Sequence, residues 1–334
     1  MRCVVTGGAG FIGSHLTEML LHAGHTVVVI DNCVTGRWSN LQQFLNSPQL
    51  ICHECDVATL KPESEFFDGA DWVFHLAALA DIVPSIERPI DYIRTNVNGT
   101  MAVLEASRRV KVKRFVYAAS SSCYGIPEQY PTRETSEIQP QYPYALSKYL
   151  GEECVLHWGK VYKMPVVSLR FFNVYGPRAR TSGTYGAVLG VFLAQKLAGQ
   201  PFTIVGDGKQ SRDFTYVTDV ADALFTAARS DSSGEVFNVG SGEPHSVNDL
   251  VKLLGGPVTY IPKRPGEPDM TWADISKIQK LLHWKPKVSF SEGVQSVLNV
   301  IDYWKDAPVW SPEKIQKATE GWFKYLSPSG EKIV

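Results

Sequence analysis

The sequence predicts an α/β fold in which a doubly wound parallel sheet is followed by a smaller C-terminal α/β lobe. Three observations predict it. Short β-branched runs alternate with longer amphipathic runs over the first two-thirds of the chain, a glycine-rich turn follows the first short run, and the pattern changes after Asn173. Strand–helix alternation is typical of βαβ units, whose right-handed crossovers place helices on both faces of a parallel sheet.

The predicted strands are continuous apolar runs, which indicates burial on both faces of the sheet. The amphipathic stretches between them predict the covering helices. We expect strands at residues 2–5, 26–30, 50–55, 71–76, 114–118 and 165–170, and helices at residues 11–21, 93–109 and 144–161.

The last third of the chain predicts the smaller lobe. Glycine and proline separate shorter elements there, and residues 262–268 form a loop rich in both. Residues 211–228 and 235–238 again have the patterns of a helix and a strand. We therefore expect a large domain at residues 1–175, to which residues 211–240 return, and a lobe formed by residues 176–210 and 241–330.

Composition excludes several classes of function. Of the 334 residues, 44% are hydrophobic and 20% are charged; there are 33 Lys and Arg residues and 34 Asp and Glu residues. A net charge of -1 gives no footprint for nucleic acid or an anionic membrane. The chain has no apolar run of about 18 residues and no signal-peptide pattern, and its six cysteines are scattered. We expect a cytoplasmic protein with reduced thiols and no metal site.

The glycine-rich turn has the spacing of a phosphate-binding site. Gly7, Gly10 and Gly13 permit a tight turn and let a pyrophosphate approach the backbone, while the following helix offers free N–H groups. Asp31 ends the second strand, where a carboxylate accepts hydrogen bonds from a ribose diol and repels a 2′-phosphate. The turn predicts a dinucleotide site that prefers NAD to NADP, although Arg37 nearby could accommodate the phosphate.

A tyrosine and a lysine four residues apart indicate acid–base chemistry. Tyr144 and Lys148 lie one helical turn apart on one face. A lysine charge stabilises a phenolate and lowers the pKa of the phenol from about 10. Ser120 follows the fifth strand, at the sheet edge where such folds bind ligands, and could share a proton with Tyr144.

Together these features resemble the extended short-chain dehydrogenase/reductase family, and within it the NAD-dependent nucleotide-sugar epimerases. The resemblance covers nearly the whole chain. It implies a Rossmann-type fold and NAD binding for the large domain, a substrate-binding role for the smaller lobe, and assembly as a homodimer through the helices at 93–109 and 144–161. The matching segments are residues 6–13, 31–32, 55–57, 75–78, 96–100, 120–125, 144–148, 170–173 and 212–214.

The resemblance implies a role for each matched residue. Tyr144 is the expected base, and Ser120 is the expected proton shuttle. Lys148 is expected to lower the pKa of Tyr144 and to contact the nicotinamide ribose. Asp56 and Val57 would lie at the adenine, and Asn96 near the nicotinamide. The expected NAD-binding residues are Gly7, Gly10, Phe11, Ile12, Gly13, Asp31, Asn32, Asp56, Val57, Leu76, Ala77, Ala78, Asn96, Tyr144 and Lys148.

The implied substrate is a nucleotide sugar, most readily a UDP-sugar. Asn173, Arg212 and Arg264 would hold its diphosphate, because guanidinium geometry matches phosphate oxygens. Residues 202–205 would lie along the nucleobase. The expected substrate-binding residues are Ser120, Ser121, Ser122, Asn173, Val188, Leu189, Thr203, Val205, Arg212, Arg264 and Thr271.

Relatives of this kind oxidise the sugar at C4 and differ in the step that follows. Dehydratases and decarboxylases of the family carry acids where this chain has Ser121 and Ser122. Epimerases that act beside a ketone carry a cysteine two residues before the position of Tyr124, whereas Cys123 is one residue before it. Without those groups, the 4-keto sugar would rotate and take the hydride back on its other face, which is 4-epimerisation.

The sequence leaves the sugar open. Thr271 aligns with a gate that is bulky in enzymes restricted to plain hexoses, so a small residue leaves room for an N-acetyl group, and residues 183–188 are similar to N-acetylhexosamine epimerases. UDP-glucose/galactose and UDP-N-acetylglucosamine/galactosamine are the expected pairs. The alternatives are a 4,6-dehydratase, a UDP-uronate 4-epimerase, a decarboxylase and, in another class, a non-catalytic NAD-binding regulatory module.

Overall fold

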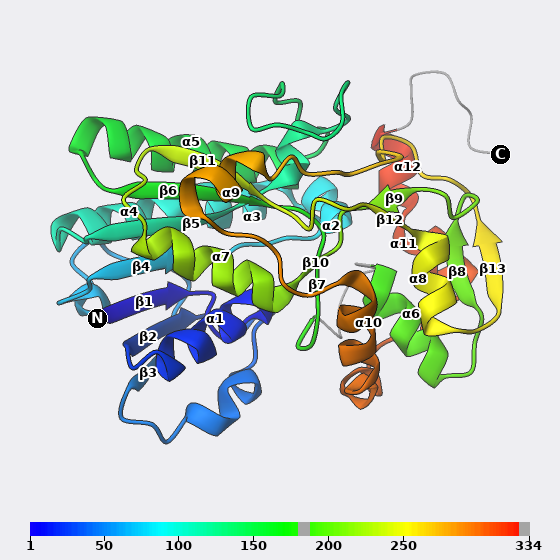
Figure 1. The fold of residues 1–334 in the computed structure, drawn as a ribbon, viewed down its shortest axis with the longest axis horizontal. Coiled ribbons are helices and arrows are strands. Elements are labelled where there is room, and N and C mark those ends of the chain that lie inside the picture. The colour runs from blue at the N-terminus through cyan, green and yellow to red at the C-terminus, as the bar shows by residue number, and fades with distance from the viewer. Residues whose placement is uncertain (180–187, 327–334) are drawn as a thin grey trace.

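A seven-stranded parallel sheet forms the centre of the larger of two lobes in the computed structural model, which describes residues 1–179 and 188–326 (Figure 1). The strand order is β11-β6-β5-β4-β1-β2-β3, so the predicted Rossmann-type sheet is confirmed. The strands are β1 Arg2–Thr6, β2 Thr26–Asp31, β3 Leu50–Glu54, β4 Trp72–His75, β5 Arg114–Ser120, β6 Val166–Phe171 and β11 Glu235–Val239.

Helices cover both faces of this sheet, and each face has its own apolar core. Alternate residues of β1 serve the two sides: Cys3 and Val5 belong to one core, and Val4 to the other. The first core is covered by α1 Phe11–His22, α7 Val217–Arg229 and α9 Ser276–Leu282, and the second by α4 Gly99–Arg109 and α5 Pro143–Tyr162.

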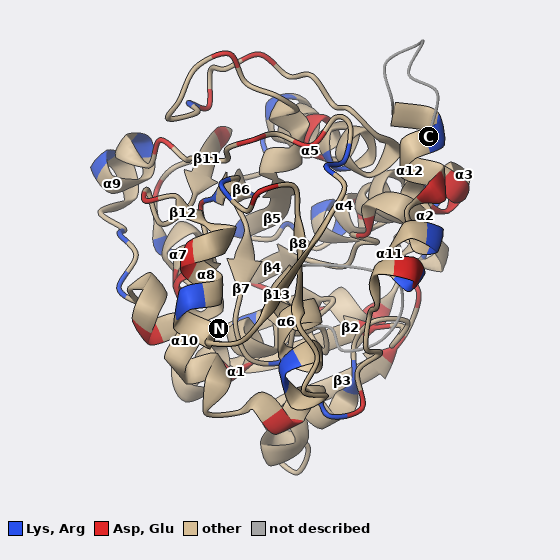
Figure 2. Ribbon diagram, turned by 90° about the vertical axis from the view of Figure 1, so that its right-hand side faces the viewer, with Lys and Arg blue, Asp and Glu red and all other residues tan. Residues whose placement is uncertain are grey.

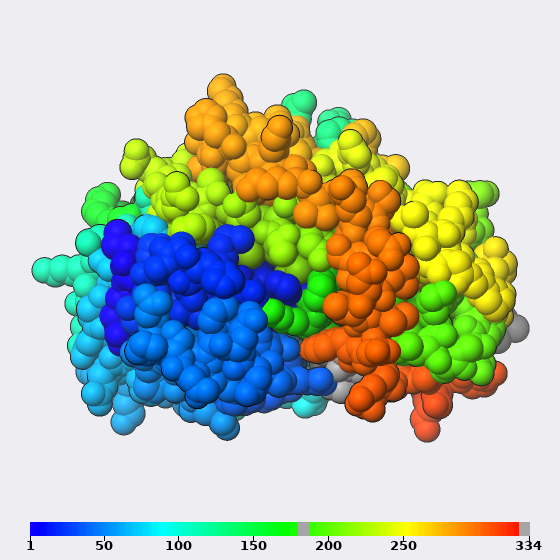
Figure 3. Space-filling view, turned by 60° about the horizontal axis from the view of Figure 1, so that its bottom comes forward, coloured from blue at the N-terminus to red at the C-terminus, as the bar shows by residue number. Residues whose placement is uncertain are grey.

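The smaller lobe surrounds a third core, built around Phe192, Phe202 and the fully buried Trp304. Its strands β8 Phe202–Val205 and β13 Val258–Ile261 pair in parallel. Its helices are α6 Val188–Leu197, α8 Val247–Leu254, α10 Phe290–Leu298, α11 Pro312–Ala318 and α12 Glu320–Leu326. Figure 3 shows the orange segment that contains α9 and α10 passing from one lobe to the other.

Two short strand pairs lie outside the seven-stranded sheet, and they show that the helix predicted at residues 211–228 begins later than expected. Residues 211–216 were expected to begin a helix, but β9 Ser211–Arg212 pairs with β12 His245–Ser246, and β10 Thr215–Tyr216 pairs with β7 Val174–Tyr175. Only then does α7 begin, at Val217. Pairing with distant segments overrides the local helical pattern, as propensity is only a weak prior.

The helix expected at residues 93–109 is interrupted by a wider turn. The chain passes through α2 Ile82–Glu87, α3 Pro89–Ile93 and a π-helical turn at Arg94–Asn98 before α4 begins. π-helical turns are rare in proteins, and those that occur are often found at functional sites. Here the turn carries Asn96, whose side chain is buried.

Acidic and basic residues are intermixed along the described chain. Figure 2 shows acidic and basic residues interspersed along the ribbon, viewed from the end formed by the smaller lobe. None of the helices in residues 1–179 and 188–326 is long and apolar enough to cross a membrane. The same ranges contain no group of three or more His, Cys, Asp or Glu placed to hold a metal ion.

A buried ion pair joins α5 to the sheet. Glu152 of α5 accepts hydrogen bonds from Arg170 of β6 at 2.5–3.1 Å and from Ser168 Oγ at 2.7 Å. Arg170 also donates to Tyr124 Oη at 2.9 Å, and Tyr124 Oη donates to Asn238 Oδ1 at 2.7 Å. Both charged side chains are almost fully buried. The pair therefore fixes the position of α5 over β5 and β6.

Removal of one partner should be costly, because it leaves the other charge buried and unpaired. We predict that Glu152→Ala lowers the free energy of unfolding by about 3–5 kcal/mol in urea titrations. Glu153→Ala, on the exposed side of the same helix, is the matched control and should change it by less than about 0.5 kcal/mol. Equal effects of the two substitutions would contradict the structural role given to the buried pair.

Candidate active site

A cavity of 240 Å³ lies at the carboxyl ends of the central strands. The loops that follow β1, β2 and β4 and the ends of β5 and β6 contribute to it, which is the edge where open α/β sheets bind ligands. Its lining includes most of the residues expected to bind NAD: Gly7, Gly10, Phe11, Ile12, Gly13, Asp31, Asn32, Val57, Leu76, Ala77, Ala78, Tyr144 and Lys148.

The glycine turn has no room for side chains. A Cβ atom on Gly13 would lie 2.1 Å from the carbonyl oxygen of Gly7, and one on Gly7, where φ is +71°, would lie 2.7 Å from the amide nitrogen of Ala77. Gly10 caps α1 without a side-chain hydrogen bond. The first turn of α1 thus has no side-chain cap, and the turn fits the pyrophosphate of a dinucleotide.

Asp31 lies at the end of β2, beside the glycine turn. Its carboxylate accepts hydrogen bonds from the backbone N–H groups of Ala9 at 3.0 Å and Cys33 at 2.9 Å. Burial raises the pKa of Asp31, and these backbone N–H groups oppose the shift. The carboxylate is therefore held in one orientation, with its side chain on the lining of the cavity.

Two of the expected NAD-binding residues are not on the lining of the cavity. Asn96 Oδ1 accepts from Leu79 N at 2.8 Å, and Asn96 Nδ2 donates to Leu79 O and to Ser147 Oγ, each at 2.9 Å. Asn96 thus fixes the loop after β4, which does line the cavity. Asp56 caps the short helix Val57–Thr59 through the Ala58 N–H and pairs with Arg94 at 3.4 Å.

Ser120 and Tyr144 meet where β5 ends. Ser120 Oγ lies 2.8 Å from Ser122 Oγ and accepts a hydrogen bond from Ser122 N at 3.2 Å. Burial raises the pKa of Tyr144, and a hydrogen bond with Ser120 opposes that shift. Ser120 therefore lies beside the phenol, and Ser122 contacts Ser120.

Lys148 lies one turn along α5 from Tyr144, with only 4% of its surface exposed. Its ammonium nitrogen is 4.3 Å from the centroid of the Tyr117 ring. Burial lowers the pKa of Lys148 to about 7, against an opposing effect of Glu152. The pKa of Tyr144 is thus raised and not lowered as expected, and burial is the largest cause.

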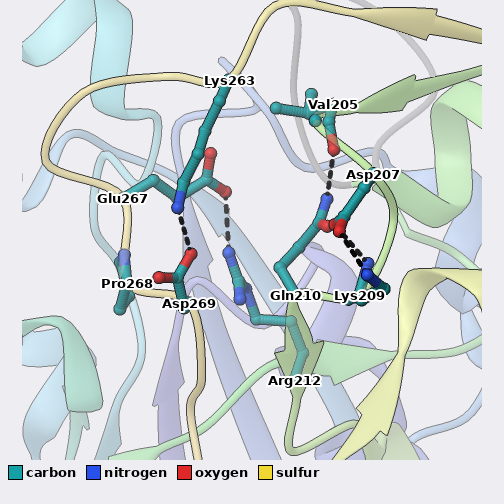
Figure 4. Close-up of a pocket in the computed structure, with 10 residues that line it drawn as sticks. Val205, Asp207, Lys209, Gln210, Arg212, Lys263, Glu267, Pro268 and Asp269 are labelled. Atoms are coloured by element: carbon teal, nitrogen blue, oxygen red, sulfur yellow. Dashed lines mark hydrogen bonds and ion pairs between the residues drawn. The ribbon is translucent and has the colours of Figure 1, made fainter.

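A second cavity, of 340 Å³, lies in the smaller lobe between β8 and the loop that precedes Met270 (Figure 4). Arg212 Nη2 contacts Glu267 Oε1 at 2.9 Å, and Arg264 Nη1 lies 3.8 Å from Glu267 Oε2. Both arginines expected to hold the diphosphate therefore meet at one carboxylate. Val205 lines this cavity, and its carbonyl oxygen accepts from Gln210 Nε2 at 2.8 Å.

Asn173 and Thr271 come together after β6. Thr271 Oγ1 donates to Asn173 Oδ1 at 2.7 Å and accepts from Asp213 N at 3.1 Å. The buried Asp213 also accepts from the backbone of Ser241, Gly242 and Ala273. These contacts hold the two expected substrate residues at the junction of the lobes.

Three other expected substrate residues are inside the smaller lobe. Thr203 is buried and hydrogen-bonds to Gln195 of α6 at 2.9 Å and 3.2 Å. Val188 and Leu189 pack in the core of that lobe. The segment similar to N-acetylhexosamine epimerases, residues 183–188, lies outside the described residues except for Val188.

Sequence reasoning missed Glu267 and Tyr142. Glu267 sits between the two arginines, and the mixed charges of residues 263–269 were a visible signal for it. The Tyr142 ring stacks on the Tyr144 ring, with centroids 6.4 Å apart and an angle of 8° between the planes. No local pattern distinguishes Tyr142 from its neighbours.

Comparison with known proteins identifies the family. Residues 3–240 match the model of the NAD dependent epimerase/dehydratase family. A putative UDP-glucose 4-epimerase of Methanocaldococcus jannaschii is 35% identical over 304 residues, which is 89% of this chain and 97% of that protein. The chain belongs to the NAD dependent epimerase/dehydratase family.

Solved structures of the family superpose closely on this chain. A UDP-N-acetylglucosamine 4-epimerase from Methanobrevibacter ruminantium is 32% identical, with a TM-score of 0.85 over 91% of this chain and 98% of that one. A UDP-glucuronic acid 4-epimerase from Bacillus cereus, solved with NAD, is 33% identical, with a TM-score of 0.84 over 92% and 99%. UDP-uronate decarboxylases match at 32–34% identity. Family membership and the fit of the glycine turn make NAD the cofactor.

The buried lysine predicts a pH dependence of stability for the cofactor-free protein. The unfolded chain keeps the Lys148 proton up to about pH 10.4, whereas the folded protein loses it near pH 7. Folding therefore releases a proton in this window, and the free energy of unfolding should rise with pH.

Subtraction of the same curve for Lys148→Met should isolate this slope, since methionine does not titrate. Chemical denaturation at intervals between pH 7 and 10 measures it. Lys160→Met, at an exposed position of α5, should leave the slope unchanged. A difference curve for Lys148→Met that is flat over these pH values would show that folding does not lower the pKa of Lys148.

Proposed function

We propose that this protein interconverts UDP-sugars that differ at C4, as an NAD-dependent 4-epimerase acting through a transient 4-keto sugar. One observation carries the proposal: Ser120, Tyr144 and Lys148 are assembled at one sheet edge, beside the cavity that the glycine turn closes. This arrangement also disfavours a non-catalytic regulatory module, because dinucleotide binding alone does not need a phenol next to a buried ammonium.

The residues divide the work in a simple way. Tyr144 would act as the base that accepts the proton of the sugar 4-hydroxyl, and Ser120 would relay that proton from the sugar to Tyr144. Lys148 would hydrogen-bond the nicotinamide ribose. NAD, held by the glycine turn and Asp31, would supply the acceptor and later the source of the C4 hydride. Arg212 and Arg264 would hold the diphosphate, which lets the sugar rotate while the nucleotide stays in place.

The neighbourhood of Tyr144 supports epimerisation over the other family reactions. Ser121 and Ser122 stand where dehydratases and decarboxylases need acids. Cys123 is 2% exposed, and burial raises the pKa of its thiol to about 12, which makes it a poor acid or base at neutral pH. A UDP-uronate 4-epimerase is the second candidate, because the similarity to the Bacillus cereus enzyme equals that to the N-acetylhexosamine enzyme.

A panel of UDP-sugars tests the proposal directly. UDP-glucose, UDP-N-acetylglucosamine and UDP-glucuronic acid are each incubated with the NAD-bound protein, and the products are resolved by NMR. The proposal expects the C4 epimer of at least one neutral sugar.

The homodimer inferred from the family resemblance stays a prediction. Exposed apolar side chains of α5 would supply its contact: Leu146, Leu150, Val161 and Tyr162.

Tyr144→Phe should reduce kcat by about 10²–10⁴-fold and leave the Kd for UDP unchanged, because it removes the ionisable oxygen and keeps the ring. Turnover and calorimetric titration of UDP measure the two effects. Tyr149→Phe on the same helix is the control and should retain activity. A loss of only a few-fold in Tyr144→Phe would assign the proton transfer to another group.

Thr271→Tyr should distinguish substrates by size. A tyrosine there would occupy the volume of an N-acetyl group and break the hydrogen bond to Asn173. We expect kcat/KM to fall more than about tenfold further for UDP-N-acetylglucosamine than for UDP-glucose. Both are measured on one preparation, so that any misfolding cancels in the ratio. An unchanged ratio would remove the support for an N-acetyl-accepting site.

A further inference from the structure

The last described helix, α12, connects the two lobes. It packs against α2 of the larger lobe and against α11 of the smaller one, and Figure 2 shows it beside both. Trp322 of α12 is 5% exposed, and its Nε1–H donates to the carbonyl oxygen of Pro265 at 2.7 Å. The end of the chain is thereby tied to the loop of residues 263–267, which carries Arg264 and Glu267.

The ring of Trp322 contacts Arg264 of the 263–267 loop on one side and Tyr142, the neighbour of Tyr144, on the other. The guanidinium carbon of Arg264 lies 5.5 Å from the Trp322 ring centroid, within the range of a cation–π contact. On the other side, the Tyr142 ring lies 6.3 Å from the Trp322 ring, at an angle of 48°. Tyr142 stacks in turn on Tyr144. One side chain thus links the expected diphosphate contact to the catalytic tyrosine.

The 263–267 loop needs such a contact to hold one shape. It contains Pro265 and Gly266, and Gly266 has a φ of +68°. Arg264 of this loop must stay near Arg212 if the two guanidinium groups, which now meet at Glu267, are to hold one diphosphate. A buried indole that binds the loop through both a hydrogen bond and a ring face reduces the freedom that ligand binding would otherwise have to remove.

We propose that Trp322 is a positioning residue of the sugar-nucleotide site: it anchors the 263–267 loop and the Tyr142 ring, so that α12 completes the wall of that site. The inference rests on the proposed function for the identity of the ligand. Trp322 acts on binding through Arg264 and Glu267 and takes no part in proton or hydride transfer. Its loss should weaken the binding of UDP and leave NAD in place.

Calorimetric titration of UDP into the NAD-bound protein tests this without turnover. Trp322→Phe removes the Nε1–H and should raise the Kd for UDP about fivefold, the factor that corresponds to one net hydrogen bond. Trp322→Ala also removes the ring and should raise it further. The Kd for NAD should change less than twofold in both variants, and KM should rise more than kcat falls.

Trp304→Phe is the matched control for a loss of packing. Trp304 is a buried tryptophan of the same lobe, 1% exposed, whose Nε1 has no hydrogen-bond partner within the described residues. This variant should lower Tm and leave the Kd for UDP unchanged. If the Trp322 variants lower Tm in the same way and bind UDP as the wild type does, α12 is only structural and the inference is wrong. A parallel loss of NAD binding would overturn it as well.

A double-mutant cycle tests the route of the effect. In an Arg264→Met background, Trp322→Phe should lose most of its effect on the Kd for UDP, because the anchored loop acts on the diphosphate through the Arg264 guanidinium. A full effect in that background would overturn the action through Arg264. If the wild type binds UDP but converts no UDP-sugar, the proposed function fails while the positioning role still stands.

Discussion

The buried ion pair between Glu152 and Arg170 is the interaction on which the site depends. Taking both charges out of water is costly, and only near-ideal geometry with further hydrogen bonds compensates for that cost. Ser168 and Tyr124 supply those bonds, and Tyr124 extends them to Asn238 on β11. One face of α5 is thereby fixed to the sheet. Tyr144 and Lys148 lie on the same helix, two turns and one turn before Glu152 respectively, so their positions over the end of β5 follow from this attachment.

The two arginines expected to hold the diphosphate are neutralised locally by one carboxylate. Glu267 occupies the two guanidinium groups that would hold a diphosphate. A ligand with two phosphates would compete with that carboxylate for Arg212 and Arg264. Lys148 is treated differently, because burial alone lowers its pKa and no carboxylate contacts its nitrogen among the ion pairs of the described residues. The buried positive charges are thus compensated in two ways: a carboxylate pairs with the arginines, whereas burial favours the neutral form of Lys148.

The shared machinery of the family explains why function is harder to resolve than fold. Hydride transfer at C4 needs the dinucleotide site and the Ser–Tyr–Lys group, which epimerases, dehydratases and decarboxylases have in common. What separates them is a few side chains beyond Tyr144. In this chain those positions are held by Ser121 and Ser122, which carry no carboxylate, and by the buried Cys123, whose thiol pKa burial raises to about 12. The proposal of a 4-epimerase depends on these groups.

The sequence by itself determined the sheet, the glycine turn and the helix that carries Tyr144 and Lys148. Strands buried on both faces leave continuous apolar runs, and a turn against a pyrophosphate leaves glycines at set spacings, so both signals are local. The tertiary structure decided the rest. Residues 211–216 pair with distant strands in place of forming a helix, and Asn96 binds the Leu79 backbone and not the cavity. Glu267 meets Arg212, and Trp322 meets Pro265, across 55 and 57 residues of chain. Such contacts are set by how the two lobes close on each other, and no short stretch of sequence records that.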